Sequence, residues 1–461
     1  MSKDMARALI TDLYELNMAA SYLRRGMTAR ATFSLTVRGL PPDRGFLVAA
    51  GIDDCVDYLE TFRFEGEDLD WLARHGFSAD AIEAFRDIRF TGDVEAVDEG
   101  RIVLPQEPLL EVTAPLPEAQ LVETFLLNQI TYQTAIATKA VRCKLAAGPI
   151  DLVDFALRRT HGVEAGMAVA RISAMAGFVA TSNVEAARAL ELMPSGTMAH
   201  SYIEAFPSEA AAFRAFTEDL PPPYTFLVDT YDTLEGVETA ARVIEDLGLT
   251  EKVAIRLDSG DLATLARQAR AMLDGRGLSH VGIFVSGSLD EYQLEDFARS
   301  KAPIDAAGVG TRLGTAADAP FVDSVYKLVD VDGRPVMKLS PAKETLPGAK
   351  QVWRARGRAD VLARREEAGP DGASPLLQPA IRDGRRIRAR SEISEARAQL
   401  DTDLAWLPDG AKRIRKPEPA GPLVSDALQE LAHVTRVAAE NTAASEMLAG
   451  QDMAGGTRQE T

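Results

Sequence analysis

The feature that most constrains the fold is a repeated alternation in the middle of the chain, where short β-prone runs are each followed by helix-like sequence. One run follows another at intervals of roughly 19 to 29 residues, which is typical of βα units. The runs lie at Leu152, Phe178, Thr197, Phe226, Ala254, Ile283 and Ile304. About seven consecutive units favour a closed or nearly closed α/β barrel over a doubly wound sheet.

The sequence outside this repeat is of mixed type. Residues 1–150 combine strand-like and helix-like segments and end in a helical pattern of about eight turns, so we predict an α+β domain with a long connecting helix. The barrel is predicted at 151–320. Residues 321–448 return to strands and then to helical sequence that completes the N-terminal domain, and 449–461 are expected to form a flexible polar tail. The sequence assigns no role to an Arg-rich helical stretch at 382–397.

The charge balance and the cysteines limit the partners and the compartment. The 461 residues carry a formal net charge of -18, which repels nucleic acid and anionic membranes, so an anionic substrate must be held by local cations and backbone NH groups. Only Cys55 and Cys143 are present, far apart in apolar sequence, and they predict buried, reduced thiols without a zinc site. No run approaches about 18 uninterrupted apolar residues. We therefore predict a cytoplasmic protein with neither a nucleic-acid nor a membrane partner.

In an α/β barrel the chemistry lies where the strands end, and here these positions are polar or glycine. Asp229 and Asp258 end neighbouring strands, where carboxylate oxygens suit magnesium. The alternative is that both residues cap the helices that follow, a common use of Asp after a strand. Arg256 lies within an apolar strand, so its charge either points into the barrel mouth or pairs with a carboxylate.

Three further features suit a phosphorylated substrate. The turn Gly308–Thr311 follows a strand and offers backbone NH groups to phosphate oxygens, although such a loop is often no more than a turn. The segment Lys338–Lys350 gathers cations in an otherwise acidic chain, either as an anion-binding flap or as a solvated loop. His200 falls at a predicted strand end and is either a functional or a structural histidine.

Separated segments in a fixed order resemble the nicotinate phosphoribosyltransferase family over most of residues 8–355. They are Leu9–Leu16, Asp154–Arg159, Gly177–Val184, Ser195–Ser201, Asp229, Arg256–Asp261, Gly308–Thr311 and Lys338–Lys350. The resemblance implies a type II phosphoribosyltransferase fold, in which an irregular α/β barrel joins a smaller α+β domain, and a homodimer with shared active sites. It also implies that nicotinate reacts with 5-phosphoribosyl 1-pyrophosphate to give nicotinate mononucleotide and pyrophosphate, in NAD salvage.

The same resemblance assigns roles in the base pocket. The pyridine ring is expected between Phe155 and Tyr14 of the partner subunit, whose flat faces suit stacking. Arg256 is similar to the family's arginine near the nicotinate carboxylate, and Arg158 to a cation that contacts the base or a phosphate. Ser182 is neutral where relatives that use nicotinamide carry an aspartate, which would repel nicotinate.

The resemblance further implies a phosphoribosyl site and coupling to ATP. The residues expected to bind substrate there are Thr197, Gly308, Gly310, Thr311 and Lys338, and those expected to hold Mg2+ are Asp229 and Asp258. Arg256 and Asp258 are expected to act in catalysis. His200 matches the histidine that the family phosphorylates from ATP, so the enzyme would be ATP-dependent and ligase-type.

Three alternatives to this function remain in view. A nicotinamide phosphoribosyltransferase is disfavoured by Ser182, and a quinolinate phosphoribosyltransferase would be shorter and need no phosphorylatable histidine. A non-catalytic sensor of phosphoribosyl ligands would be favoured by the loss of His200, Arg256 or Asp258, and all three are present.

Overall fold

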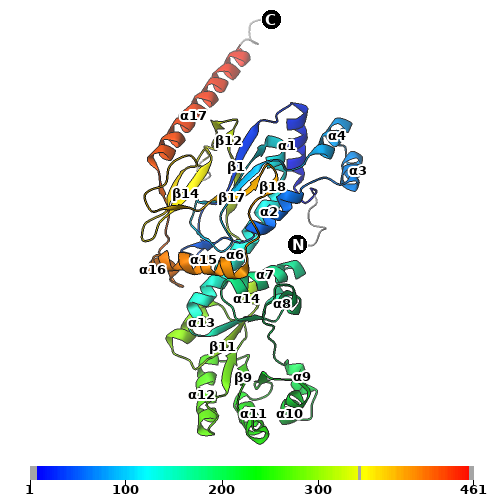
Figure 1. Cartoon of the computed structure of the whole chain (residues 1–461), viewed down its shortest axis with the longest axis vertical. Coiled ribbons are helices and arrows are strands. Elements are labelled where there is room, and N and C mark those ends of the chain that lie inside the picture. The colour runs from blue at the N-terminus through cyan, green and yellow to red at the C-terminus, as the bar shows by residue number, and fades with distance from the viewer. Residues whose placement is uncertain (1–7, 341–343, 456–461) are drawn as a thin grey trace.

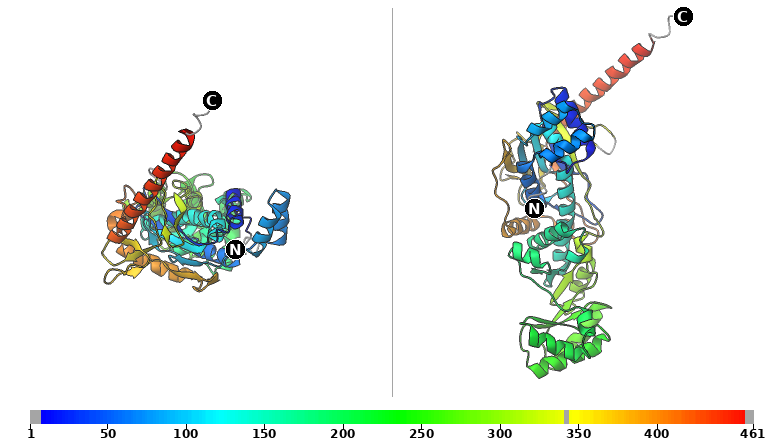
Figure 2. Two further views of the ribbon diagram at one scale, coloured as in Figure 1. Left: turned by 90° about the horizontal axis from the view of Figure 1, so that it is seen from above. Right: turned by 90° about the vertical axis from the view of Figure 1, so that its right-hand side faces the viewer.

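The computed structural model describes the backbone of residues 8–340 and 344–455, and the side chains as far as Thr442. Figure 1 shows an elongated molecule with a mixed domain, built from both ends of the chain, at one end and a parallel α/β domain at the other. Helix α6 (Glu123–Ala147) runs between the two, and helix α17 (Asp426–Gly455) projects from the body in every view (Figure 2). No helix in these ranges is long and apolar enough to cross a membrane.

The mixed domain is built on a seven-stranded sheet in the order β13-β12-β1-β5-β3-β17-β18. Its strands are β1 (Arg30–Val37), β3 (Asp93–Ala96), β5 (Pro108–Pro115), β12 (Ser324–Val331), β13 (Arg334–Pro335), β17 (Gln378–Arg382) and β18 (Arg385–Arg386). Strand β1 pairs antiparallel with β5 on one side and β12 on the other, so residues that follow the barrel complete the sheet begun before it. Phe33 and Tyr326 stack across this pairing with ring centres 4.8 Å apart.

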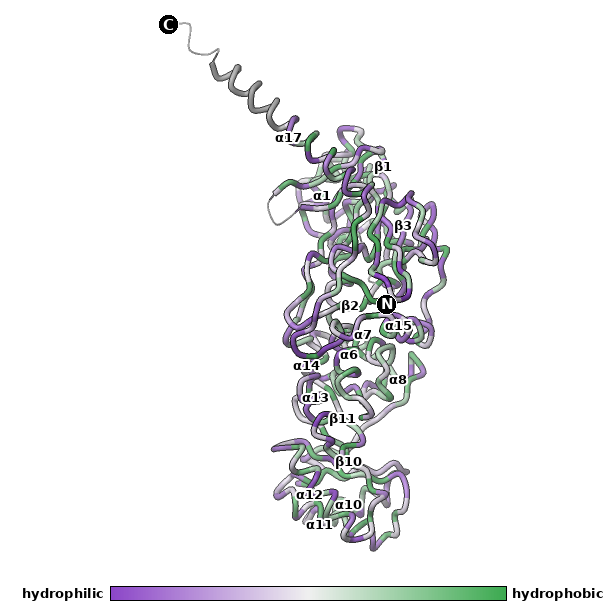
Figure 3. The backbone as a smooth tube through the Cα atoms, turned by 90° about the vertical axis from the view of Figure 1, so that its left-hand side faces the viewer, coloured by the Kyte–Doolittle hydropathy of each residue, from purple (hydrophilic) through white to green (hydrophobic). Residues whose placement is uncertain are grey.

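Helices and two smaller sheets complete this domain. The helices are α1 (Leu13–Arg24), α2 (Ile52–Thr61), α3 (Gly66–Arg74), α4 (Ala79–Asp87), α5 (Leu116–Leu121), α15 (Ile393–Trp406) and α16 (Asp409–Lys412). The smaller sheets consist of β2 (Leu47–Val48) with β4 (Ile102–Val103), and of β16 (Ser374–Pro375), β14 (Lys350–Arg354), β15 (Val361–Arg364) and β19 (Leu423–Val424). Strand β2 belongs to a hydrophobic stretch inside the body (Figure 3), where residues 46–50 are all buried.

The Arg-rich segment is not the helix expected at 382–397. Residues 378–386 form β17 and β18, and the next helix, α15, begins only at Ile393. Arg386 pairs with Asp53 and Asp57 of α2, and Arg390 pairs with Asp54 of the same helix at 2.7 Å. The arginines therefore attach the return segment to α2, and this long-range pairing explains a charge run that has no helical pattern of its own.

The α/β domain contains a parallel six-stranded sheet in the order β7-β6-β11-β10-β9-β8. Its strands are β6 (Asp151–Asp154), β7 (Ala180–Thr181), β8 (Tyr224–Leu227), β9 (Val253–Leu257), β10 (Gly282–Val285) and β11 (Ala306–Val309). The helical elements around it are η2 (Leu157–Arg159), α7 (Val163–Met175), α8 (Val184–Ala189), α9 (His200–Glu204), α10 (Glu209–Asp219), α11 (Thr233–Leu247), α12 (Leu262–Gly275), α13 (Glu291–Arg299) and α14 (Thr311–Gly314). This order is that of a barrel with an opening between β7 and β8, so the predicted α/β class is confirmed.

The expected seventh strand, at Thr197, does not form. The chain makes one parallel bridge, between Thr181 and Pro194, and then enters α9 at His200. Pro194 has no NH group to donate, and Gly196 has no side chain to pack, so the β-prone run cannot continue the ladder. The barrel is therefore open beside β7, where Thr197 lies on an irregular segment and His200 begins α9.

Helix α6 is buried on nearly every side, and its buried residues include three charged ones, Glu123, Lys139 and Arg142. Lys139 pairs with Glu291 of α13 and lies 2.7 Å from Asp318, and Arg142 lies 3.0 Å from Glu291. Arg44 of the mixed domain also reaches Asp318, at 3.0 Å. Because buried charges must be paired, this cluster ties α6 to elements of both domains.

The C-terminal helix is longer than expected. The polar tail was predicted to begin at residue 449, but α17 continues to Gly455. Residues 456–461, the remainder of the predicted tail, lie outside the described residues. A lack of apolar periodicity therefore does not end this helix, since alanine-rich sequence is intrinsically helix-forming.

Candidate active site

A cavity of about 430 Å³ opens at the carboxyl ends of the barrel strands. Its lining residues are Phe155, Leu157, Arg158, Ser182, Gly196, Thr197, Met198, Ala199, His200, Leu227, Arg256 and Asp258. Seven of the residues proposed from the sequence are therefore brought together from distant parts of the chain. These seven are Phe155, Arg158, Ser182, Thr197, His200, Arg256 and Asp258.

Arg256, on β9, lies at the centre of the hydrogen bonds in this cavity. Its Nε donates to Ser286 Oγ at 2.7 Å, its Nη1 to Thr197 Oγ1 at 2.6 Å, and its Nη2 to Asp258 Oδ1 at 2.6 Å. The residue is 9% exposed. Of the two roles that the sequence left open, a charge in the barrel mouth and a carboxylate partner, the structure has both.

Asp258 follows β9 and is ionised by its surroundings. Burial disfavours its charge, but a hydrogen bond from Ser286 and the charge of Arg256 outweigh burial, so the pKa of the Asp258 carboxyl is lowered. Its Oδ2 lies 3.9 Å from His200 Nε2. The Asp258 carboxylate thus contacts the Arg256 guanidinium and lies close to the His200 ring.

His200 begins the short helix α9 and is held from one side. Its Nδ1 lies 3.1 Å from Thr230 Oγ1, which follows β8, while its side chain is 42% exposed. Because Nδ1 is engaged, Nε2 is the ring nitrogen left for chemistry on the Asp258 side.

Neither Asp229 nor Asp258 is the helix cap that the sequence allowed. The caps of α11 and α12 are Asp232 and Asp261, each three residues farther along. Asp229 Oδ2 instead accepts hydrogen bonds from Asp258 N at 2.9 Å and from Ser259 Oγ at 2.7 Å, while Oδ1 is buried without a partner. Within residues 8–340 and 344–455 no group of three or more metal-binding side chains gathers.

The base pocket proposed from the sequence surrounds Phe155, which follows β6. Its ring lies 5.7 Å from the guanidinium carbon of Arg256 and 5.6 Å, centre to centre, from the ring of Phe284. Ser182 lies after β7, where its NH donates to Asp154 O at 2.8 Å. The exposed side chain of Arg158 makes no hydrogen bond or ion pair with any residue in the described part of the chain. A flat apolar face, a neutral hydroxyl and an available cation thus share one cavity.

The remaining predicted residues lie outside this cavity. Gly308, Gly310 and Thr311 follow or end β11 behind Phe155, and they do not line the cavity. Tyr14 is on α1, and Lys338 is an exposed residue after β13, so both belong to the mixed domain at the other end of the molecule (Figure 1). Within one chain, these two residues do not meet the His200–Arg256 cavity.

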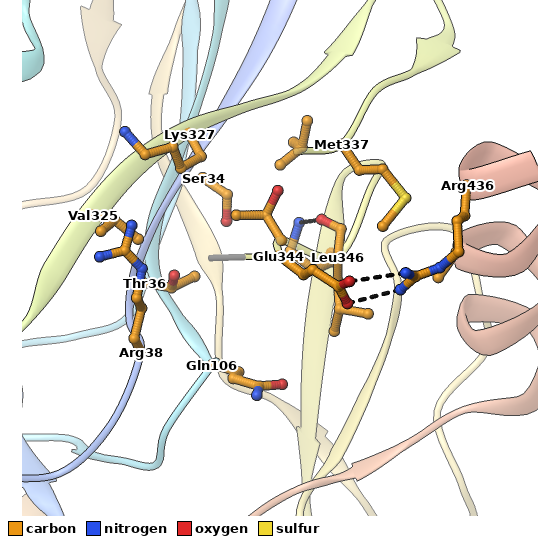
Figure 4. Close-up of a pocket in the computed structure, with 14 residues that line it drawn as sticks. Ser34, Thr36, Arg38, Gln106, Val325, Lys327, Met337, Glu344, Leu346 and Arg436 are labelled. Carbon is orange, nitrogen blue, oxygen red and sulfur yellow. Dashed lines mark hydrogen bonds and ion pairs between the residues drawn. The ribbon is translucent and has the colours of Figure 1, made fainter. Parts of the chain in front are cut away.

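A second cavity, of about 360 Å³, lies in the mixed domain between the sheet and α17 (Figure 4). Its lining residues are Ser34, Thr36, Arg38, Gln106, Val325, Lys327, Val329, Met337, Glu344, Thr345, Leu346, Lys350, Ala432 and Arg436. Three polar atoms that are buried and have no partner belong to residues of this lining: Ser34 Oγ, Arg38 Nε and Thr345 Oγ1. The lining carries four cations against one carboxylate, and each cation also has a carboxylate partner within or behind the lining. The unpartnered Arg38 Nε and the two hydroxyls are therefore the groups that favour an anionic ligand.

The segment Lys338–Lys350, weighed from the sequence as an anion-binding flap or a solvated loop, contributes four described residues to this cavity. The strand residues that complete the cavity were not predicted. Their signal was present in β1, where Ser34 and Thr36 lie on one face of a strand whose other face is apolar, and Arg38 continues this alternation directly after the strand. The pairing of β1 with β12 adds Lys327 to that face. The period of two therefore marked a polar surface on a buried strand.

The fold and the cavity together define the class of type II phosphoribosyltransferases. This chain is similar to the crystal structure of human nicotinic acid phosphoribosyltransferase, with a TM-score of 0.79 and 28% identity over 92% of this chain and 99% of that one. Family models for the nicotinate phosphoribosyltransferase N-terminal domain and for the nicotinate phosphoribosyltransferase family match residues 9–131 and 150–352. The chain belongs to the nicotinate phosphoribosyltransferase family.

Two bacterial relatives cover nearly the whole chain. A nicotinate phosphoribosyltransferase of Mycobacterium tuberculosis is 45% identical over 405 residues, which are 86% of this chain and 87% of the relative. A nicotinate phosphoribosyltransferase of Bacillus subtilis is 39% identical over 453 residues, covering 90% and 92%. These identities confirm the family recognised from the separated segments.

Proposed function

We propose that this chain transfers the phosphoribosyl group of 5-phosphoribosyl 1-pyrophosphate to nicotinate, giving nicotinate mononucleotide and pyrophosphate in NAD salvage. The observation that carries the proposal is the buried Arg256 guanidinium, fixed by four hydrogen bonds beside the ring of Phe155. A cation and an aromatic face at this spacing suit a flat ring that bears a carboxylate. The two buried, free cysteines agree with a cytoplasmic enzyme.

Nicotinate binding uses both arginines of the cavity. Each nitrogen of Arg256 already has a protein partner, and the second hydrogen of Nη2 is left for the substrate carboxylate. Arg158 supplies a second cation that pairs with no carboxylate among the described residues. The ring would lie on the exposed face of Phe155, with Ser182 at the cavity wall. Because Ser182 is neutral, the acid is preferred over the amide.

The transfer step breaks the bond between the anomeric carbon and pyrophosphate and forms a bond from that carbon to the pyridine nitrogen. Positive charge builds on the ribose as pyrophosphate leaves, and the ionised Asp258 lies where it would stabilise this charge. A magnesium ion, when bound, neutralises the leaving group. Asp229 Oδ1 and Asp258 Oδ2 are free of hydrogen bonds and would hold the ion together with substrate phosphates. No protein nucleophile takes part in this transfer.

Coupling to ATP is the second part of the proposal and rests on His200. Nε2 attacks the γ-phosphorus of ATP, a new N–P bond forms, and the bond to the β-phosphate oxygen breaks to release ADP. Thr230 holds Nδ1, so Nε2 faces the cavity, and Asp258 would stabilise the positive charge on the imidazole. Hydrolysis of the phosphohistidine would then accompany product formation, which makes the reaction ligase-type.

We also propose that two copies of the chain form a homodimer with shared active sites. The support is geometric, because Tyr14 and Lys338 lie in the domain remote from the His200–Arg256 cavity. The second cavity, with its unpartnered Arg38 Nε and Ser34 Oγ, gives the same domain a surface suited to phosphate. A partner's mixed domain would then bring an aromatic ring and cations to the barrel of the first copy.

The activity assay separates the candidate functions. Purified chain is incubated with 5-phosphoribosyl 1-pyrophosphate, Mg2+ and either nicotinate or nicotinamide, with and without ATP, and mononucleotide and ADP are quantified by chromatography. Nicotinate mononucleotide that increases with ATP supports the proposal. Reaction with nicotinamide alone would refute the argument from Ser182, and reaction with neither base would favour the sensor alternative.

A mixing experiment tests the shared site. Tyr14→Ala and Arg256→Ala variants, each inactive alone, are unfolded, mixed and refolded in equal amounts. Since half of randomly formed dimers are mixed and each has one intact site, activity should return to about a quarter of wild type. Arg38→Ala in place of Tyr14→Ala should give the same result if the second cavity faces the partner's barrel. No recovery in either mixture would mean that each site is complete within one chain.

A further inference from the structure

Gly308, on β11, lies directly against the ring of Phe155. A Cβ added at Gly308 would lie 2.5 Å from Phe155 Cδ2 and 2.6 Å from Cε2, and 3.2 Å from Phe284 Cε1. Real Cβ atoms essentially never come this close to a neighbour. Any side chain at residue 308 would therefore have to displace the Phe155 ring.

The backbone at Gly308 does not itself require glycine. Its φ lies outside the left-handed region that favours glycine, and β11 keeps a regular parallel register, with Gly308 opposite Val153 of β6. Strand interiors normally disfavour glycine, because it packs no side chain there. The remaining reason for a glycine at residue 308 is the space that the Phe155 ring needs.

Three neighbouring strands fix the ring of Phe155 where the cavity begins. Gly308 of β11 provides the room, Phe284 of β10 stacks on the ring at 5.6 Å, and Arg256 of β9 places its guanidinium carbon 5.7 Å from the ring centre. The NH of Phe155 also donates to Val309 O at 2.9 Å. The ring can yield to a new side chain only by moving toward the open space of the cavity.

We propose that Gly308 is a positioning residue that sets the depth of the aromatic slot for nicotinate, and that it is not part of a phosphate-binding turn. This inference rests on the proposed function and deepens it. The glycine keeps the Phe155 ring low against the sheet, so that the distance between this ring and the opposite wall matches one flat heteroaromatic ring. This role would replace the one expected from the sequence, in which Gly308 binds the phosphoribosyl group.

The size of the displacement follows from the contact distances. An ordinary carbon–carbon contact is about 3.5 Å, so a methyl group at residue 308 moves the ring by about 1 Å. A misplacement of about 1 Å in a substrate-positioning group costs on the order of a hundredfold in rate. Because the Phe155 ring contacts nicotinate in the ground state as well as in the transition state, we assign most of this cost to KM. Gly308→Ala should lower kcat/KM for nicotinate by about ten- to a hundredfold and leave KM for 5-phosphoribosyl 1-pyrophosphate within about twofold.

A double-variant cycle isolates the contact with the ring. Phe155→Leu replaces the ring with a shorter side chain, so the addition of Gly308→Ala to Phe155→Leu should cost less than about threefold, because coupled neighbours are not additive. Gly282→Ala is the matched control, since Gly282 is also a strand glycine of this sheet and its added Cβ would be an ordinary 3.5 Å from Ala254 Cβ. This control should keep wild-type kinetics.

Steady-state kinetics with each substrate varied and thermal unfolding are measured for all four variants. The proposal is supported if the nicotinate effect of Gly308→Ala disappears in the Phe155→Leu background. It is overturned if KM for 5-phosphoribosyl 1-pyrophosphate rises as much as KM for nicotinate, or if the two substitutions are additive. The unfolding temperatures test the packing without any substrate. Gly308→Ala should lower the unfolding temperature of the wild-type chain, and the same substitution should have little effect in the Phe155→Leu background. If the two substitutions lower the unfolding temperature additively, the packing argument is overturned. A wild-type chain that does not use nicotinate would refute the proposed function instead.

Discussion

The replacement Arg256→Lys tests the proposed role of the guanidinium with little change in charge. Arg256 makes hydrogen bonds of 2.6–2.7 Å to Thr197, Ser286 and Asp258, and each of these three bonds comes from a different nitrogen of the guanidinium. A lysine ammonium reaches at most one of these acceptors and cannot offer a fixed pair of NH groups to a substrate carboxylate. Two hydrogen bonds at about 1 to 1.5 kcal/mol each are lost, or about 2 to 3 kcal/mol in total.

If that loss falls on the transition state, kcat/KM for nicotinate decreases about 30- to 160-fold. The assay is steady-state formation of nicotinate mononucleotide at saturating 5-phosphoribosyl 1-pyrophosphate and Mg2+. Arg270→Lys is the matched control, because Arg270 on α12 also makes three hydrogen bonds, to Asp274, Leu278 and Val281. It should change the unfolding temperature but not the kinetics. A kcat/KM for Arg256→Lys within threefold of wild type would refute the reasoning.

Three further outcomes are expected. His200→Ala should abolish ADP formation and the stimulation by ATP, while ATP-independent synthesis of nicotinate mononucleotide continues; a variant that still hydrolyses ATP in step with product formation would contradict the phosphohistidine. Ser182→Asp should raise KM for nicotinate at least tenfold, or about 1.4 kcal/mol, and should not raise KM for nicotinamide, as competition assays can measure. The pKa of Asp258 is lowered from its ordinary value of 3.8, so this carboxylate remains ionised at a lower pH than an ordinary aspartate does. Ser286→Ala removes a hydrogen bond that favours the ionised form, which should raise this pKa and move the acidic limb of the pH–rate profile to higher pH. An unchanged acidic limb would show that Asp258 does not control it.

Local patterns in the sequence were enough to locate the barrel and the strand ends that carry the cavity. Arg256 was recognisable because a charge within an apolar strand needs a special environment, and the structure gives it one. Other features depended on distant partners. The Arg-rich segment was predicted as a helix from its local sequence alone. The residues that it pairs with, Asp53 and Asp57, lie more than three hundred residues earlier in the chain, so no local pattern could show that pairing.

Small differences in position also limited the sequence analysis. Asp229 and Asp258 were weighed as helix caps, but the caps lie three residues beyond each of them, at Asp232 and Asp261. Thr197 was assigned to a strand from its β-prone neighbours, whereas Pro194 limits pairing there to one bridge. Such choices depend on hydrogen bonds that form only after the sheet has assembled.

The paired charges on α6 have a consequence for how the two ends of the molecule are spaced. The helix has 25 residues, so it spans about 37 Å, and each residue contributes about 100° of rotation. Insertion of a single alanine near its middle would turn the barrel by about 100° relative to the mixed domain, while lengthening the helix by only about 1.5 Å. Lys139 and Arg142 lie beyond the insertion and would turn together with Glu291 of α13. Arg44 of the mixed domain would then face away from Asp318. The length of this helix, counted in residues, thus fixes the direction in which the nicotinate cavity opens.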